Sequence, residues 1–129
     1  GVKKKDVNTN EILLTDYKKY YEQVLTNNSG NEFVSENPYI EWYLIYKNSN
    51  LVGSIYIQSD NSIGMNFNEP NEDDVLEVIN YIKNNHHPLP PIKSLRRGEF
   101  FVNIASDDLI MTQILNKLNK KEIQCSFVI

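Results

Sequence analysis

The stretch that decides the fold covers residues 42–67 and reads WYLIYKNSNLVGSIYIQSDNSIGMNF. Aromatic and β-branched residues dominate residues 42–46 and 51–57, and the last part alternates apolar residues with others. Two short segments rich in Asn, Ser and Asp separate the three parts, as turns do. The stretch therefore predicts a meander of three hairpin-linked strands. Gly53 and Gly64 lie inside these strands and indicate a bulge or a close backbone approach.

A helical pattern precedes the meander. Thr15 is suited to cap this helix, Asp16 to the positive end of its dipole, and residues 27–31 (NNSGN) to end it. Residues 2–7 form a weaker strand pattern before it. The apolar residues at helical spacing are Leu13, Tyr17, Tyr20, Tyr21, Val24 and Leu25.

Two more helices and two more strands are predicted after the meander. Asn71 caps a helix that ends near residues 84–85, and three prolines stiffen the connector 86–91. Residues 100–104 resemble a buried strand, and Ser106 is suited to cap the last helix. The inward-facing residues are expected to be Val75, Val78, Ile79 and Ile82 in the first of these helices and Ile110, Ile114, Leu115 and Leu118 in the second. A final strand is predicted to alternate through Ile123, Cys125, Phe127 and Ile129.

The predicted order of elements is β-α-β-β-β-α-β-α-β, which defines an α/β (α+β) class with a mixed sheet and helices on its faces. The chain has 129 residues, enough for one core, so residues 1–129 are expected to form a single domain. Gly1 in place of Met indicates a tag remnant or an excised domain. An Asn, Lys and Ile bias is typical of an AT-rich genome, so a lone Asn is weak evidence for a site.

Composition and charge exclude several classes of protein. Apolar residues make up 40% and Gly and Pro are five each, which excludes collagen-like and wholly disordered chains. The net charge of −4 gives no support to binding of nucleic acid or anionic membranes, and no stretch is long enough to span a bilayer. A single cysteine, Cys125, can form neither an internal disulfide nor a zinc site. We therefore expect a soluble protein of a reducing, cytoplasmic compartment.

By this order of elements, the chain resembles the GNAT superfamily of acyl-CoA-dependent N-acyltransferases. Residues 5–11 are similar to the first strand and helix entry of that family, and residues 42–55 to its second and third strands with their Val-Gly pair. Residues 62–67 occupy the place of the fourth strand, and residues 101–118 with the final strand resemble the closing half. The resemblance implies a GNAT-like fold, acetyl-CoA as cofactor if the chain is active, and a small amine or amino-sugar as acceptor.

Two segments depart from the family pattern. The loop that should be glycine-rich and hold the CoA pyrophosphate at a helix N-terminus is here residues 68–74 (NEPNEDD), with no glycine, no basic residue and four carboxylates. The closing helix lacks the family tyrosine that acts as a general acid, because Leu115 stands in that position and cannot donate a proton. The neighbouring motif positions also differ and carry Asp108, Met111, Asn119 and Lys120. The resemblance therefore implies a degenerate site.

The candidate site residues follow from the resemblance and from residue chemistry. Glu41 is a possible base and Tyr81 an alternative acid. The cofactor-binding candidates are the backbone of Met65, Asn66 and Phe67 together with Asn71, Glu72 and Asp73. The candidates for a substrate cleft are Trp42, Tyr43 and Asn103, although packing in the core or on the sheet is the simpler interpretation for the aromatic pair. No metal site is expected.

Other chemistry-bearing residues have simpler interpretations. The pair His86-His87 is expected to be an exposed connector, and the acidic run 69–74 a charged helix start and not a cation site. The segment 96–98 (RRG) could hold a carboxylate or phosphate, but a solvated turn is the simpler interpretation. Cys125 is expected to be buried filler.

Two functional hypotheses follow. The first is a GNAT-like domain that has lost acyl-CoA use and serves as a binding, interaction or regulatory domain. Its partner would be another protein or a second copy, contacted through Tyr17, Tyr20 and Tyr21. The alternative is an active N-acetyltransferase acting on a small amine or amino-sugar.

Overall fold

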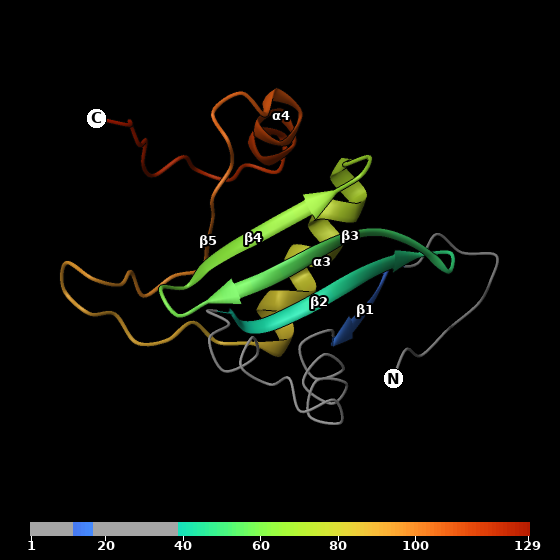
Figure 1. Cartoon of the computed structure of the whole chain (residues 1–129), viewed down its shortest axis with the longest axis horizontal. Helices are drawn as coiled ribbons and strands as arrows, with labels where there is room; N and C mark the ends of the chain where they lie inside the picture. The colour runs from blue at the N-terminus through green and yellow to red at the C-terminus, as the bar shows by residue number, and fades with distance from the viewer. Residues whose placement is uncertain (1–11, 17–38) are drawn as a thin grey trace.

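The structure is a computed structural model that describes residues 12–16 and 39–129. In chain order the described elements are β1 (Ile12–Asp16), β2 (Tyr39–Lys47), β3 (Asn50–Gln58), β4 (Ser62–Phe67), α3 (Glu72–Asn85), β5 (Phe101–Val102) and α4 (Leu109–Lys117). They form a mixed α+β fold with one sheet, whose strands lie in the order β1-β2-β3-β4-β5 (Figure 1). The predicted α+β class with a mixed sheet is confirmed.

The predicted meander forms the centre of the sheet. Strands β2, β3 and β4 pair antiparallel, with Tyr43 opposite Ile55 and Ile55 opposite Met65. Asn48 and Ser49 connect β2 to β3 with φ values of 50° and 71°. A two-residue hairpin turn of type I′ requires two consecutive positive φ angles, and its twist matches that of the flanking strands.

The two glycines inside the strands mark two close approaches. A Cβ on Gly53 would lie 2.1 Å from the carbonyl oxygen of Asn66 in β4, so no side chain fits there without moving the strand backbone. A Cβ on Gly64 would meet the ring of Tyr56, which lies opposite it on β3. The predicted close backbone approach is confirmed at Gly53, whereas the neighbour of Gly64 is an aromatic side chain.

Helix α3 begins and ends where the sequence predicts. Asn71 is its N-cap, and the Asn71 side chain accepts a hydrogen bond from the backbone N–H of Asp74 at 3.0 Å. The helix ends at Asn85, and the backbone N–H of His86 donates to the carbonyl oxygen of Ile82. Val75, Val78 and Ile82 are buried and Ile79 is half-buried, as expected.

The core lies between one face of the sheet and the two helices. Alternate residues of β2, β3 and β4 point to this face, and Figure 1 shows α3 crossing behind these strands. The buried residues are Tyr43, Ile45, Ile55, Ile57, Ile63 and Met65 from the sheet, Val75, Val78 and Ile82 from α3, and Met111 and Ile114 from α4. Burial of eleven apolar side chains is the main stabilising contribution of the described residues.

Strand β5 is parallel to β4 and pairs with only its first two residues. Ser62 lies opposite Phe101 and Ile63 opposite Val102, after which the chain leaves the sheet towards α4 (Figure 1). The strand predicted over residues 100–104 is therefore present but shorter. Residues 64–67 of β4 extend beyond the last residue that pairs with β5.

The start of α4 differs from the prediction. Asp108, and not Ser106, is the N-cap, because the Asp108 carboxylate accepts from the N–H of Met111 at 3.1 Å. The buried face of the helix also differs from the prediction. Met111 is buried in place of Ile110, which is 59% exposed, while Ile114 is buried and Leu115 and Leu118 pack partly against the core.

Two further predictions are wrong, one at each end of the described chain. Thr15 was expected to cap a helix containing Leu13, but both residues belong to strand β1, which pairs antiparallel with β2. Residues 123–129 were expected to form a strand, but they have no regular structure and are exposed, because alternation alone is insufficient without an adjacent strand. The strand pattern at 2–7 and the rest of the first helix lie outside the described residues.

Candidate functional site

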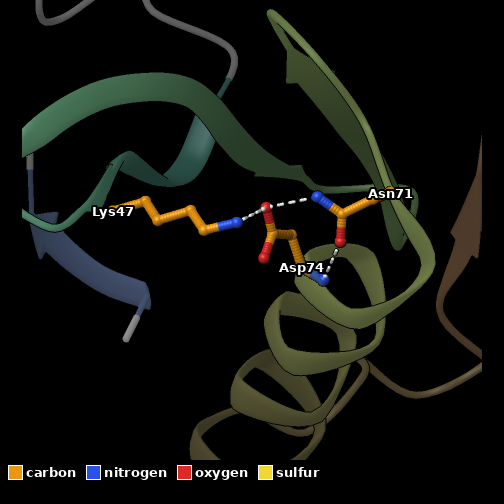
Figure 2. Close-up of polar contacts among 3 residues, drawn as sticks. All are labelled: Lys47, Asn71 and Asp74. Atoms are coloured by element: carbon orange, nitrogen blue, oxygen red, sulfur yellow. Dashed lines mark hydrogen bonds and ion pairs between the residues drawn. The ribbon is translucent and has the colours of Figure 1, made fainter. Parts of the chain in front are cut away.

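The resemblance directs attention to the end of β4 and the N-terminus of α3, where a network of three polar side chains lies (Figure 2). The Asp74 carboxylate accepts hydrogen bonds from Asn71 Nδ2 at 2.7 Å and from Lys47 Nζ at 3.1 Å. Asn71 also caps the helix through its side-chain oxygen. The network therefore joins the β2–β3 hairpin to the first turn of α3.

Burial makes this network a part of the structure and not a solvated surface pair. The Asp74 side chain is only 8% exposed and that of Lys47 is 27% exposed. A buried carboxylate needs a cation and hydrogen-bond donors, and Lys47 and Asn71 supply them. The Asp74 carboxylate also lies at the positive end of the helix dipole, which stabilises it further.

More negative charge surrounds this helix start. Glu69, Glu72 and Asp73 are all exposed. Glu72 is near only one cation in the described part of the chain, Lys117 of α4, at 3.9 Å. The N-terminus of α3 is thus already supplied with anions by the chain itself.

The other cofactor-binding candidates lie on β4 beside this helix start. Met65 is buried and faces the helices, Asn66 is exposed, and Phe67 is half-buried against the core. All three belong to the part of β4 that extends beyond its pairing with β5. The structure therefore brings Met65–Phe67 and 71–74 to the same end of the sheet.

The aromatic candidates form a second cluster at the other end of α3. The ring of Tyr43 packs edge-on against that of Tyr81, with centroids 5.6 Å apart. A hydrogen bond of 2.6 Å joins the Tyr43 hydroxyl to His86 Nε2. Seven residues of helix separate Tyr81 from Asp74, so Tyr81 lies two turns, or about 10 Å, along the axis from the N-terminal network. Tyr81 therefore belongs to a cluster separate from the cofactor-binding candidates.

The remaining candidates are scattered. Trp42 and Tyr43 are neighbours on β2 and point to opposite faces of the sheet, so they cannot line one cleft together. Glu41 is half-buried and lies opposite Ile57, at the end of the sheet away from Asn71. Asn103 is exposed directly after β5.

Four of the less favoured residues also have defined surroundings. Arg96 is not a solvated turn residue, because its Nε donates to the carbonyl oxygen of Pro90 at 2.7 Å and its Nη1 to that of Ser59 at 3.3 Å. Cys125 is exposed, so its expected burial is wrong. Of the pair expected to be an exposed connector, His87 is exposed, but His86 is half-buried and bonded to Tyr43, so the prediction is wrong for His86. Within residues 12–16 and 39–129, no three His, Cys, Asp or Glu residues come close enough to hold a metal ion.

Sequence reasoning missed two residues that organise the fold. Lys47 was assigned to a turn, and only the strand register shows that it reaches Asp74, 27 positions later. Asn61 was also assigned to a turn, but it is 1% exposed and bonds to two distant backbone segments. Asn61 has a positive φ of 72°, which asparagine adopts more readily than most residues, so the residue type was the only sequence signal of its role in the turn.

Comparisons with known proteins give no relative. No protein-family model, no curated protein and no solved structure matches the chain. None of the helices in the described segments has the length and apolar character needed to cross a bilayer.

Proposed function

We propose that this chain is a GNAT-like domain that has lost standard acetyl-CoA-dependent catalysis and serves as a binding, interaction or regulatory domain. One observation carries the proposal. The helix start that should attract the CoA pyrophosphate is capped by Asn71 and supplied with the buried Asp74 carboxylate. Lys47, the cation nearest to this position, is engaged by Asp74.

Electrostatic repulsion between the carboxylates at this helix start and a phosphate would weaken the binding of CoA. A phosphate about 5 Å from a carboxylate is repelled by roughly 1–3 kcal/mol at an effective dielectric constant of 20 to 80. Glu69, Glu72 and Asp73 are exposed around the same helix start, so the repulsions add. Pro70 removes one backbone N–H donor from the loop. The loop therefore has the wrong charge, and one backbone donor fewer, for binding a pyrophosphate.

The alternative function, an active N-acetyltransferase, is favoured by one different observation. Strand β4 extends beyond its parallel pairing with β5, so the backbone of residues 64–67 has no β5 partner on that side. An acyl thioester could hydrogen-bond to such a strand. The acceptor would then be a small amine or amino-sugar, with Glu41 too far along β2 to act beside this part of β4.

The decisive experiment is a calorimetric titration of the chain with acetyl-CoA and with CoA. We expect no binding heat at millimolar ligand. Micromolar affinity would contradict the proposal, and release of CoA in the presence of amines would establish the alternative. Sedimentation equilibrium of the chain alone tests separately whether its interaction partner is a second copy of itself.

A charge-removal variant tests the physical reason. The variant E69Q/E72Q/D73N removes the exposed carboxylates at the helix start while it leaves Asp74 in its network. We expect this variant to bind CoA more tightly than the wild type. The control E99Q/D107N/E122Q removes the same charge from other exposed positions and should change nothing. Equal CoA affinity in both variants would refute the electrostatic argument.

A further inference from the structure

A solvent-open cavity of about 490 Å³ lies at the end of β4 opposite to the start of α3. Its wall is the loop that follows α3, residues 91–97, together with Asp60 of the β3–β4 turn, Phe101 of β5 and Gln124 of the C-terminal segment. Six residues of β4 separate this end from the network at Asp74, which is about 17–20 Å of extended chain. Figure 1 shows the loop projecting beyond the β3–β4 turn, far from the α3 N-terminus. The cavity is therefore distinct from the candidate site described above.

The loop is held in one conformation by a buried asparagine. Asn61 Nδ2 donates to the carbonyl oxygens of Leu89 at 2.9 Å and of Arg97 at 2.7 Å, and the N–H of Leu89 donates to Asn61 Oδ1 at 2.8 Å. These bonds fix both ends of the loop to the β3–β4 turn. Within the loop, Ile92 and Arg96 form an antiparallel bridge.

Arg96 holds the last part of the loop in place. Its guanidinium donates to the carbonyl oxygens of Pro90 and Ser59, and its side chain is half-buried. Two adjacent prolines, Pro90 and Pro91, restrict the backbone further. The loop therefore loses its conformational entropy on folding, and a ligand does not have to order it on binding.

The charge of this cavity is opposite to that of the protein. Lys93, Arg96 and Arg97 line it against one carboxylate, Asp60, in a chain of net charge −4. In the part of the chain that the structure describes, neither Lys93 nor Arg97 uses its side chain in an ion pair or a hydrogen bond. Both cations are exposed at the cavity and available to a ligand.

Besides the polar residues Ser94 and Gln124, the rest of the lining is apolar. Phe101 is half-buried, and Ile92 and Leu95 are 44% and 77% exposed, unusually open for such side chains. A volume of this size falls within the range of small-molecule sites. The lining thus combines an excess of about two positive charges with a hydrophobic wall.

From this combination we infer that the cavity binds a small phosphate monoester whose phosphate contacts Lys93 and Arg97 and whose organic part packs on Phe101 and Leu95. A phosphate monoester carries close to two negative charges at neutral pH, which matches the excess positive charge of the lining. Guanidinium and ammonium groups form strong charge-assisted hydrogen bonds to phosphate oxygens. A carboxylate carries half that charge and binds less tightly.

The test is an NMR titration of the ¹⁵N-labelled chain with phenyl phosphate, with benzoate, phenol and inorganic phosphate as comparison ligands. Shifts of backbone amides are expected at residue 60, through residues 92–97 and at residue 101, with a millimolar dissociation constant for phenyl phosphate. Benzoate and inorganic phosphate should each bind several-fold more weakly, and phenol should not bind. Equal affinity for benzoate would overturn the phosphate assignment, and equal affinity for inorganic phosphate would overturn the hydrophobic contact.

A pair of charge variants completes the test. K93Q/R97Q changes two exposed side chains and should weaken phenyl phosphate binding about tenfold. The control K83Q/K120Q removes two exposed cations elsewhere and should leave the affinity unchanged. The inference fails if no loop amide shifts, if the shifts centre on residues 69–74, or if both variants bind like the wild type. A dispersed spectrum of each variant shows that it is folded.

Discussion

Replacement of Asn61 by glycine should destabilise the protein strongly, although this residue lies in a turn. The side chain is 1% exposed and satisfies two carbonyl oxygens and one N–H of the backbone. Each such bond contributes about 0.5–1.5 kcal/mol net, and a buried group left without a partner costs more. We expect N61G to lower the free energy of unfolding by about 2–4 kcal/mol.

Glycine is chosen because it removes the side chain without backbone strain. Asn61 has a φ of 72°, a conformation that alanine adopts only at a cost, so N61A would mix two effects. The matched control is N119G, at an exposed asparagine with a φ of 59°. Both variants gain the same backbone freedom, so the difference between them isolates the three hydrogen bonds.

Urea unfolding followed by the fluorescence of Trp42, the single tryptophan, measures both variants. For a chain of this length, a loss of 2–4 kcal/mol corresponds to a melting temperature lower by roughly 8–16 °C. A difference between N61G and N119G below about 1 kcal/mol would refute the reasoning, since water would then replace the side chain at little cost.

Three further predictions concern other contacts. G53A should lower the free energy of unfolding by about 3 kcal/mol, near the upper end for overpacking, because the new methyl group meets strand backbone. G64A should lower it less, because a tyrosine ring can move aside. Equal losses of stability in thermal melts would contradict this expectation. K47M should lower stability by about 1–3 kcal/mol by leaving the Asp74 carboxylate buried without its cation, and the loss should largely disappear when D74N is added. Y43F should cost about 0.5–1.5 kcal/mol through its lost hydrogen bond, and a neutral result in urea unfolding would show that the bond contributes nothing.

Local sequence signals predicted the centre of the fold well. The strands of the meander and helix α3 were predicted because alternation, turn residues and an asparagine cap all specify the same local structure there. The start of α4 was wrong by two residues because Ser106 and Asp108 are both good caps. The structure uses Asp108, whose carboxylate accepts from the N–H of Met111, and the residue types alone do not decide between the two caps.

Sequence patterns whose structure depends on pairing with a distant segment were less informative. Residues 123–129 alternate as a strand should, yet the described chain offers them no paired neighbour. Leu13 and Thr15 fit a helix pattern, but they belong to a strand because this segment pairs with β2. Among the candidate site residues, those close in sequence, Met65–Phe67 and 71–74, also lie close in space. Glu41 and Tyr81 could not be placed, because their surroundings depend on strand register and helix length.

The order of strands in the sheet follows the order of the chain, and this has a kinetic consequence. Each of the pairs β1–β2, β2–β3 and β3–β4 joins neighbours along the sequence, and β2–β3 and β3–β4 need only short loops to close. The parallel pair β4–β5 instead requires that α3 and the proline-containing loop be in place first. We expect the meander to form the folding nucleus and β5 to join after the rate-limiting step. Destabilising changes at Phe101 would then accelerate unfolding, while those at Ile55 would slow folding.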